Sequence, residues 1–254
     1  MRLHDKVVVV TGAASGMGLA MAKLFTAEGA SVVAGDWNAQ RLDAAVQEIT
    51  ANGGKITGQQ GDISDKASAE GLVNLAVETY GKLDVLVNNA GIMDYMAGVD
   101  AVTDEIWQKV LAVNLDGPMY TTRRAVQVML EAGHGSIINI GSTASLSGGA
   151  AGVAYTVSKH ALMGLTKNTA WMYAKRGIRC NAVLPGGTNT NIQETMPQDR
   201  LDPVGMQRQM EFGALCPLYL ESDDIAKAAL FFASDDSRFI NGAILTADGG
   251  WMAL

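Results

Sequence analysis

Short apolar segments alternate with helical patterns along the chain, and this alternation restricts the possible folds more than any other feature of the sequence. Residues 6–11 form a run rich in β-branched side chains, which is typical of a strand buried on both faces. The apolar segments predict strands at 6–11, 31–36, 56–61, 83–88, 135–140, 178–184 and 243–246. The helical patterns predict helices at 19–28, 38–51, 64–80, 103–131, 155–175 and 222–234. Such an alternation indicates right-handed crossovers, and therefore an α/β fold with a parallel sheet between helices.

The sequence predicts one domain that spans residues 1–254. A chain of 254 residues suits one large α/β domain, and no linker or shift in composition divides it. Residues 186–217 interrupt the alternation, because they contain Pro197, Pro203 and Pro217 and only a weak helical pattern. A connection of this length in a compact domain usually has a function. We therefore expect a substrate lid at about residues 186–217.

Charge and cysteine content argue against several classes of protein. The net charge of −7 argues against nucleic acid or an anionic membrane surface as a partner. Cys180 and Cys216 belong to no cysteine or histidine cluster, so we expect neither a disulfide framework nor a metal site. The sequence has no signal-peptide core and no apolar run near the roughly 20 residues of a membrane helix. These features predict a cytoplasmic protein.

A glycine-rich turn follows the first predicted strand, with glycines at positions 12, 16 and 18. Glycine permits a tight turn and lets the backbone approach a pyrophosphate closely. The helix that begins after the turn adds unpaired N–H groups and a positive dipole end. The spacing Gly-x-x-x-Gly-x-Gly differs from the usual Gly-x-Gly-x-x-Gly dinucleotide motif. Its position after the first strand nevertheless predicts a dinucleotide site.

Asp36 ends the second predicted strand and indicates which dinucleotide binds. An acid at this position can accept hydrogen bonds from the ribose hydroxyls of adenosine, and its charge repels a 2′-phosphate. No lysine or arginine in the glycine turn or at residue 37 compensates that charge, so we predict NAD rather than NADP. The alternative role of Asp36 is a helix cap. Asp62 and Asn89 follow the next two strands, at the same carboxyl edge of the sheet.

Tyr155 and Lys159 lie four residues apart, and therefore on one face of a helix. The positive charge of the lysine favours the ionised phenol, so we expect the pKa of Tyr155 to fall from about 10 toward neutral pH. A phenol tuned in this way can give a proton to a carbonyl oxygen or take one from an alcohol. The pair alone also occurs by chance, as a surface aromatic beside a solvated lysine.

Taken together, these motifs resemble the short-chain dehydrogenases/reductases over essentially the whole chain. The matching motifs are Thr11-Gly12-x-x-x-Gly16-x-Gly18, Asp36, Asp62, Asn88-Asn89-Ala90-Gly91, Asn114, Ser142, Tyr155-x-x-x-Lys159, Pro185-Gly186 with Thr190, and Asp248-Gly249-Gly250. The resemblance implies a single Rossmann-type, doubly wound domain with a seven-stranded parallel sheet. It also implies assembly as a homotetramer.

The resemblance implies four catalytic residues, which are Asn114, Ser142, Tyr155 and Lys159. Tyr155 corresponds to the general acid/base, and Lys159 to the residue that holds the nicotinamide ribose and lowers the pKa of the phenol. Ser142 corresponds to a hydrogen-bond partner of the substrate oxygen, where charge develops during hydride transfer. Asn114 corresponds to the residue that holds a water in a proton relay, although asparagine inside a helix can also be a simple local irregularity.

The cofactor contacts that the resemblance implies follow the strand ends in order. They are Gly12, Ser15, Gly16, Met17, Gly18, Asp36, Asp62, Ile63, Asn89, Tyr155, Lys159, Pro185, Gly186, Thr188 and Thr190. Met17 stands where the family motif more often has isoleucine, a swap that conserves apolar volume. Residues expected on the substrate side are Met93, Asp94, Thr143, Ser145, Gly148, Gly149, Ile192, Met196, Leu201, Met206 and Met210, unless several of them pack in the core.

The predicted function is an NAD-dependent interconversion of a secondary alcohol and a ketone, with a small-molecule substrate. The alternatives are a 3-oxoacyl-(acyl carrier protein) reductase, a sugar or polyol dehydrogenase and a hydroxysteroid dehydrogenase. Asp36 disfavours the first of these, because such reductases generally use NADPH. A regulator that binds NAD without turnover is a further alternative, and the presence of Ser142, Tyr155 and Lys159 argues against it.

Overall fold

The computed structural model describes residues 1–253, so Leu254 of the predicted domain lies outside the described residues. Seven parallel strands form one sheet in the order β3-β2-β1-β4-β5-β6-β7. Every predicted strand is present, with small shifts at the ends. The strands are β1 (Val7–Thr11), β2 (Ser31–Asp36), β3 (Lys55–Gln60), β4 (Val85–Asn88), β5 (Gly135–Ile140), β6 (Ile178–Pro185) and β7 (Ile244–Ala247).

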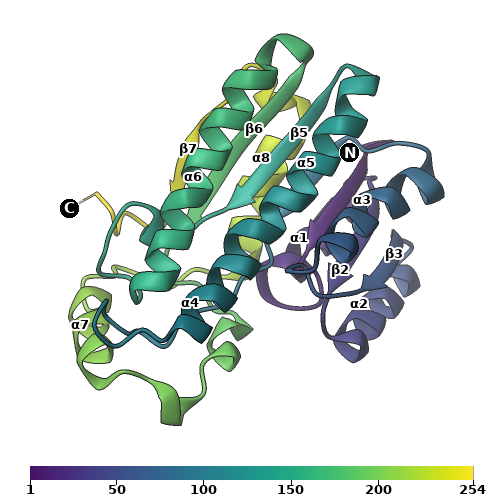
Figure 1. Cartoon of the computed structure of the whole chain (residues 1–254). Coiled ribbons are helices and arrows are strands. Elements are labelled where there is room, and N and C mark those ends of the chain that lie inside the picture. Colours follow the sequence, from purple (N-terminus) through teal and green to yellow (C-terminus); the bar gives the residue numbers. More distant parts are fainter. Residues whose placement is uncertain (254) are drawn as a thin grey trace.

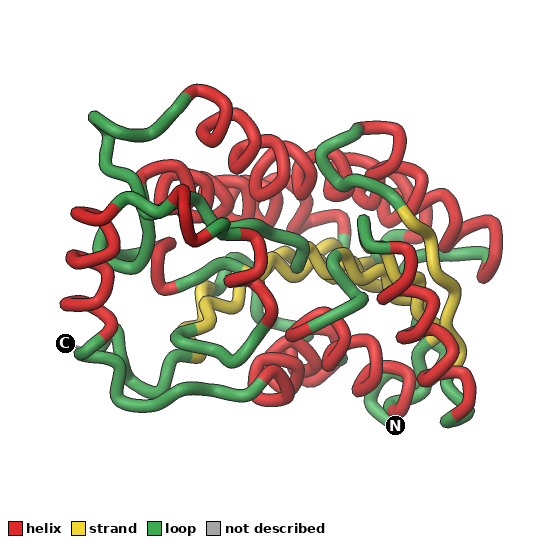
Figure 2. Tube along the Cα trace, turned by 90° about the horizontal axis from the view of Figure 1, so that it is seen from below, coloured by secondary structure: helices red, strands yellow, loops and turns green. Residues whose placement is uncertain are grey.

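Helices cover both faces of the sheet, which confirms the predicted doubly wound α/β fold and its single domain (Figures 1 and 2). They are α1 (Gly16–Ala27), α2 (Ala39–Ala51), α3 (Lys66–Tyr80), α4 (Asp104–Leu111), α5 (Gly117–Ala132), α6 (Val153–Tyr173), α7 (Pro203–Gly213) and α8 (Ser222–Ala233). Figure 2 shows the strands as a central layer between two layers of helices.

Alternate residues of the strands feed two separate cores, because neighbouring side chains of a strand point to opposite faces. Val8 and Val10 pack with α1 and α8, where Phe25 and Phe232 fill the first core. Val9 lies on the other face, in the core that includes residues of α3 and α5. Both faces of the central strands are therefore apolar, as parallel sheets require.

The helix predicted at 103–131 is in fact two helices. A π-helical turn at Ala112–Asp116 separates α4 from α5. Pro118 follows this turn within continuous helical backbone, where its missing N–H removes one helical hydrogen bond. The single helical pattern of the sequence gave no sign of the extra residue that a π turn accommodates.

The segment 186–217 has more structure than its weak pattern predicts. It contains short 3-10 turns at Asn191–Thr195 and Gln198–Arg200, followed by helix α7. Asp202 caps α7 by accepting a hydrogen bond from the Gly205 N–H at 2.7 Å, and Pro203 takes the first helical position. Phe212 of α7 packs on Trp251, with ring centroids 4.7 Å apart. The proline-rich stretch therefore starts a helix rather than preventing one.

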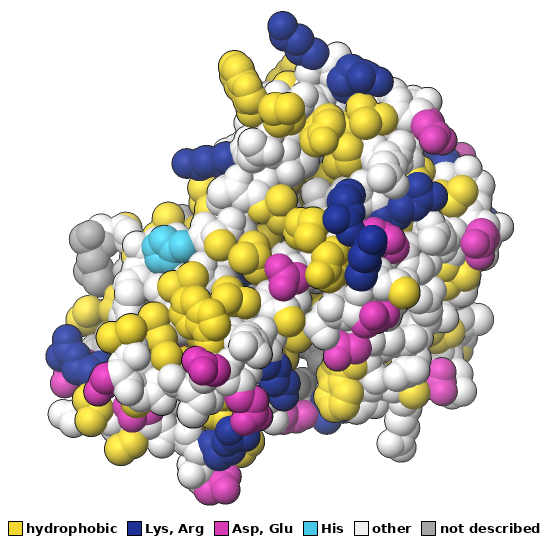
Figure 3. Space-filling view, viewed as in Figure 1, with side chains coloured by type: hydrophobic (Ala, Val, Ile, Leu, Met, Phe, Trp, Pro, Cys, Tyr) yellow, Lys and Arg dark blue, Asp and Glu magenta, His cyan; other side chains and the backbone are white. Residues whose placement is uncertain are grey.

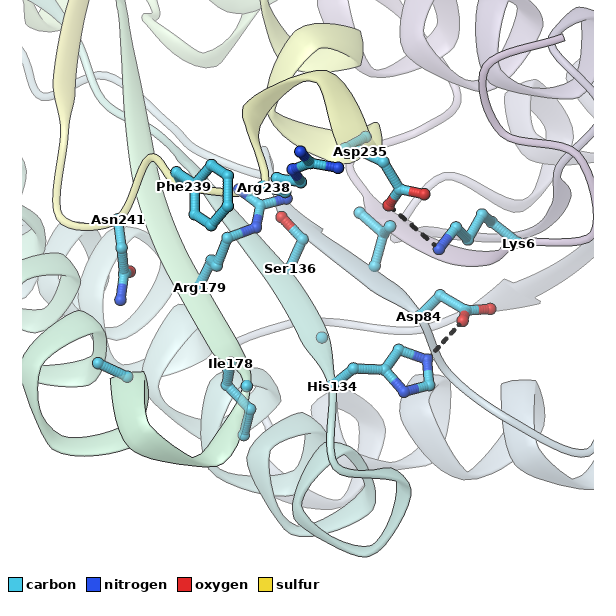
Figure 4. A pocket seen from close by; sticks show the side chains of 15 residues that line it. Lys6, Asp84, His134, Ser136, Ile178, Arg179, Asp235, Arg238, Phe239 and Asn241 are labelled. Carbon is cyan, nitrogen blue, oxygen red and sulfur yellow. Dashed lines mark hydrogen bonds and ion pairs between the residues drawn. The ribbon is translucent and has the colours of Figure 1, made fainter.

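Asp84 joins three strands at the amino edge of the sheet, opposite the loops that carry the predicted site. Its carboxylate accepts hydrogen bonds from the Val7 N–H at 2.7 Å and the Lys82 ammonium at 2.9 Å. The His134 ring approaches it at 3.1 Å, as Figure 4 shows in a cleft of about 430 Å³. Burial by itself raises the pKa of Asp84, but the hydrogen bonds from Val7, Lys82 and His134 together hold it below its usual 3.8.

Within residues 1–253, no helix has the length and apolar character needed to cross a membrane. The same residues hold no cluster of three or more metal-ligating side chains, and both cysteines are free thiols.

We predict that Asp84→Asn lowers the free energy of unfolding at pH 7 by about 2–4 kcal/mol. The reason is that the Val7 N–H and the Lys82 ammonium lose their charged acceptor. The folded-state pKa is depressed, so the contribution is present above the unfolded pKa near 3.9 and disappears as pH falls below it. Urea unfolding of both proteins between pH 3 and 7 measures the difference. Asp235→Asn is the control in the same cleft, since its exposed pair with Lys6 should contribute under about 1 kcal/mol.

Candidate active site

All the predicted site residues follow the carboxyl ends of strands or lie on α6 and the π-helical turn, so the sheet gathers them at one edge. This edge faces the viewer in Figure 2 and lies at the bottom of Figure 1, beside α4 and α7. Strand β1 leads into the glycine turn, β2 into Asp36, and β5 into Ser142. Ligands bind at such an edge in open α/β sheets.

The glycine turn forms a cradle in which side chains do not fit. Gly12 has a φ of +65°, and a Cβ there would lie 2.9 Å from Cα of Ala90. A Cβ on Gly18 would lie 2.0 Å from the carbonyl oxygen of Gly12. The Ser15 side chain precedes α1 but forms no capping hydrogen bond with it, and the first turn of α1 contains no acidic residue. The first N–H groups of α1 are therefore available to an anionic group such as a diphosphate.

Thr11 and Asn89 fasten this cradle to the neighbouring strand end. The Thr11 hydroxyl accepts hydrogen bonds from the N–H groups of Asn89 and Ala90, each at 3.0 Å. In return, the Asn89 amide donates to the carbonyl oxygens of Thr11 and Gly12 at 2.9 and 3.1 Å. The predicted residue Asn89 thus shapes the glycine turn through its side chain.

Asp36 is half-buried and is turned toward the same cradle. Its carboxylate accepts hydrogen bonds from the N–H groups of Ala14 at 3.0 Å and Asn38 at 2.9 Å. Asn38, rather than Asp36, caps helix α2. The nearby Arg41 forms an ion pair with Glu194 at 2.7 Å.

The remaining predicted cofactor residues lie around the cradle. Ile63 is buried and packs against Gly117 at the start of α5, whereas Asp62 is exposed and accepts hydrogen bonds from Ser64. After β6, a Cβ on Gly186 would collide with Asp248 at 2.7 Å, and the Thr188 hydroxyl donates to the Gly186 carbonyl. Thr190 approaches Gly16 closely, so the start of the 186–217 segment lies against the glycine turn.

Ser142 begins a short 3-10 turn directly after β5. Its hydroxyl accepts a hydrogen bond from the Ala144 N–H at 3.1 Å, while Ser145 accepts one from the Ser142 N–H at 3.2 Å. This reciprocal capping fixes the position of Ser142. The hydroxyl is close enough to the phenol of Tyr155 to lower its pKa.

Tyr155 and Lys159 are both buried, and the lysine lies beside the aromatic ring. The ammonium is 5.5 Å from the ring centroid of Tyr155 and donates a hydrogen bond to the Ile140 carbonyl at 3.0 Å. Burial is the strongest influence on both groups. It raises the pKa of Tyr155 to about 12 and lowers the pKa of Lys159 to about 8. The predicted fall of the Tyr155 pKa is therefore wrong, because burial disfavours the phenolate more than the hydrogen bond from Ser142 favours it.

Asn114 owes its position to the π-helical turn. Its side chain is fully buried, accepting from the Ile92 N–H and donating to the Ile92 carbonyl, both at 2.9 Å. It also donates to the Ser158 hydroxyl at 3.2 Å, which in turn donates to the Tyr155 carbonyl at 2.7 Å. A Cβ on Gly91 would lie 3.4 Å from Asn114 Oδ1 and 3.5 Å from Lys159 Nζ. Asn114 and Lys159 thus border the same small space.

Comparison with known proteins agrees with this geometry. A family model described as Enoyl-(Acyl carrier protein) reductase matches residues 12–252. The 3beta-hydroxysteroid dehydrogenase 2 of Eggerthella lenta is 44% identical over 254 residues, covering 99% of this chain and 96% of that protein. The Short chain dehydrogenase adrF of Penicillium rubens is 39% identical and covers 99% of each chain. The chain belongs to the short-chain dehydrogenase/reductase family.

Solved structures of the family have the same architecture. Levodione reductase superposes with a TM-score of 0.90 at 32% identity, covering 99% of each chain. A putative NAD(P) dependent gluconate 5-dehydrogenase from Beutenbergia cavernae, with bound NADP at low occupancy, superposes with a TM-score of 0.88 at 34% identity. It covers 99% of this chain and 98% of its own.

Three residues expected on the substrate side of this short-chain dehydrogenase/reductase instead lie in its interior. Asp94, Thr143 and Ser145 are buried, which supports the alternative that part of the expected set packs in the core. Sequence reasoning also missed Ser158, which connects Asn114 with the backbone of Tyr155. Its position between Tyr155 and Lys159 was the available signal, since a serine inside a helix often bonds to a backbone carbonyl.

We predict that Lys159→Met stabilises the fold while removing a site residue. The folded-state pKa of about 8 lies below the unfolded value near 10.4, so burial of the ammonium is unfavourable below pH 8. At pH 7 the free energy of unfolding of the variant should exceed that of the wild type by about 1–3 kcal/mol. This difference should become smaller as pH rises from 8 to 10.

Urea unfolding across that pH range measures this difference. Lys167→Met, at an exposed position of the same helix, is the control and should show neither the gain nor its pH dependence. A Lys159→Met protein less stable than the wild type at pH 7 would contradict the assignment.

Proposed function

We propose that this protein is an NAD-dependent oxidoreductase that interconverts a secondary alcohol and a ketone, with Tyr155 as the general acid/base. The observation that carries the proposal is the cluster of the buried Tyr155 and Lys159 with the half-buried Ser142, at the same edge of the sheet as the glycine cradle. Such a cluster combines a proton donor, a second hydrogen-bond donor and a cation next to a dinucleotide site.

The residues of the glycine cradle fit a dinucleotide. Backbone N–H groups at the start of α1 would hold the diphosphate, and Gly12 and Gly18 let the turn pack closely against itself and Asn89. Asp36 would accept from the adenosine ribose, while Asp62, Ile63 and Asn89 would border the adenine side. Pro185, Gly186, Thr188 and Thr190 would contact the nicotinamide end, and Lys159 its ribose. The bound cofactor supplies or accepts the hydride.

The protein's own groups handle the proton. In ketone reduction, the protonated phenol of Tyr155 donates to the carbonyl oxygen, and its raised pKa keeps it protonated at neutral pH. The Ser142 hydroxyl donates to the same oxygen and stabilises its developing charge. In alcohol oxidation the phenolate accepts the proton, so this direction should accelerate as pH rises. Asn114 and Lys159 lie close together beside Gly91, and they would form the path by which Tyr155 exchanges its proton.

Two features support NAD over NADP. The carboxylate of Asp36 would repel a 2′-phosphate. Arg41, the cation nearest to Asn38 along α2, is already paired with Glu194 at 2.7 Å. The neighbour from Beutenbergia cavernae was solved with NADP, so the fold alone does not decide the cofactor, and the proposed preference for NAD rests on Asp36 and Arg41.

A hydroxysteroid is the substrate class that we propose. The support is the relative from Eggerthella lenta, whose name specifies a 3beta-hydroxysteroid and whose sequence is 44% identical to this one. Methionines and leucines of the 186–217 segment, among them Leu201 and Met206, would form an adaptable apolar wall against the steroid ring system. This role makes the segment a lid.

An acyl carrier protein is a weaker candidate, although the matching family model carries such a name. An acidic carrier requires unpaired cations near the site. The arginines of the lid are paired instead, Arg200 with Glu105 and Arg208 with Glu211. Figure 3 shows acidic, basic and apolar side chains intermixed around α7. A regulator without turnover is disfavoured as well, because Tyr155, Ser142 and Lys159 are all in place.

We also propose cytoplasmic location and assembly as a homotetramer. Free cysteines suit a reducing compartment. The tetramer is the assembly that the family resemblance implies, and sedimentation of the purified chain tests it.

Tyr155→Phe should reduce kcat at least about 100-fold, because it removes only the transferable proton. NADH absorbance with a panel of 3β-hydroxysteroids, their 3-ketones, polyols and simple ketones measures the activity. NADH binding, followed by fluorescence, should stay within about threefold of the wild-type value. Activity that survives the substitution would refute the mechanism, and turnover of polyols alone would refute the substrate class.

Asp36→Ser should lower the ratio of kcat/KM with NAD to kcat/KM with NADP at least about tenfold, because a negative charge and a ribose acceptor are lost. Steady-state kinetics with each cofactor at saturating alcohol measure the ratio. Equal or better kinetics of the wild-type protein with NADP would contradict the assignment.

A further inference from the structure

Asp94 is a buried acid outside the cluster of Tyr155, Ser142 and Lys159. It lies between β4 and α4, and only 1% of its surface is exposed. The sequence gave this residue two alternatives, the substrate side or the core, and both of its carboxylate oxygens accept hydrogen bonds from backbone N–H groups of the protein. A buried carboxylate needs hydrogen bonds to offset its lost hydration, so its partners define its role.

The partners of Asp94 are backbone N–H groups at the start of the helix that carries Tyr155. One carboxylate oxygen accepts from Met96 and Gly152, each at 3.1 Å, and the other accepts from Tyr155 itself at 2.9 Å. Helix α6 begins at Val153, and Gly152 before it has no side chain to cap it. Asp94 therefore caps α6 from a segment 58 residues earlier in the chain.

Close packing leaves this connection little freedom. A Cβ on Gly152 would lie 2.6 Å from the Asp94 carboxylate. Met96 adopts a φ of +62°, a left-handed conformation that is unfavourable for methionine. Such backbone strain persists only where the surroundings hold it in place, and the hydrogen bond from the Met96 N–H to Asp94 is one of those restraints.

The same short segment also contacts the lid. The Asp202 N–H donates to the Tyr95 carbonyl at 2.9 Å, and the Met93 N–H donates to the Thr195 hydroxyl at 3.1 Å. On its other side, the Val153 N–H donates to the Ala97 carbonyl at 3.0 Å. Residues 93–97 thus lie between the first turn of α6 and the lid.

The charge of Asp94 also acts on the phenol. Its negative charge raises the pKa of Tyr155, although burial is the larger cause. The other charged group that faces the phenol is Lys159 on the same helix, and Arg200 of the lid lies over the Tyr95 ring at 4.7 Å. Removing the Asp94 charge should therefore favour the phenolate.

We propose that Asp94 is a positioning residue that holds the first turn of α6, and with it Tyr155, in the reactive arrangement. The proposal rests on the proposed function of Tyr155. It assigns Asp94 to the orientation and ionisation of the phenol, and not to contact with substrate or cofactor.

Three variants test the proposal, namely Asp94→Asn, Asp94→Ala and the exposed control Asp100→Asn. Asp94→Ala should lower kcat about 100-fold, since a small displacement of a reacting group has that effect. NADH affinity should stay within about threefold, because the glycine cradle is untouched. Asp94→Asn retains one acceptor oxygen and should lose less activity. The acid limb of its pH profile for alcohol oxidation should shift to lower pH.

Amide hydrogen exchange provides a readout that does not depend on activity. Residues 152–156 should exchange faster in Asp94→Asn than in the wild type, while the glycine turn at 12–18 should be unchanged. If Asp94→Ala fails to fold, Asp94→Asn and its exchange pattern decide the matter.

Unchanged kcat, pH profile and exchange at 152–156 in Asp94→Asn would overturn the proposal. Loss of activity only in proportion to unfolded protein, with an unshifted profile, would overturn it too, because Asp94 would then be purely structural. An inactive wild type or an active Tyr155→Phe would refute the proposed function instead, and exchange at 152–156 would still test the position of Asp94.

Discussion

The burial of the Lys159 ammonium beside the Tyr155 phenol is the interaction on which the site depends. A buried cation is unfavourable by itself, and here a single carbonyl, that of Ile140 at the end of β5, accepts its hydrogen bond. Burial shifts both pKa values toward the neutral forms, so the pair is sensitive to any charge placed near it. The cluster therefore needs fixed surroundings, which β5, the π-helical turn and the first turn of α6 provide.

The two edges of the sheet serve different purposes. At the amino edge, Asp84 precedes β4 and forms hydrogen bonds with Val7 of β1 and Ser136 of β5, so it connects the three strands. At the carboxyl edge, Lys159 is buried with one acceptor and Met96 is strained. Stability from the core and the amino edge allows unfavourable groups to persist at the candidate active site.

Much of the fold and of the candidate site could be predicted from the sequence. Buried parallel strands have continuous apolar sequences, so the run at 6–11 matched β1 to within one residue. The glycines at 12, 16 and 18 were predicted as a cradle because backbone geometry demands them. Asn114 was assigned only by family resemblance, since a π turn leaves no mark on a helical pattern. The pKa of Tyr155 was mispredicted because sequence spacing shows a neighbouring charge but not the burial of both groups. The place of Asp94 stayed open for a similar reason, as its partners are backbone N–H groups far along the chain.

Transfer of isotope tests the central account most directly. A 3β-hydroxysteroid that carries deuterium on C3 can be incubated with the protein and NAD, and the reduced cofactor analysed by mass spectrometry and NMR. The account predicts one deuterium per turnover on the reduced nicotinamide and a 3-ketosteroid as product. A ketone formed with the deuterium lost to water, or no deuterium on the cofactor with any secondary alcohol of the panel, would contradict hydride transfer at this site.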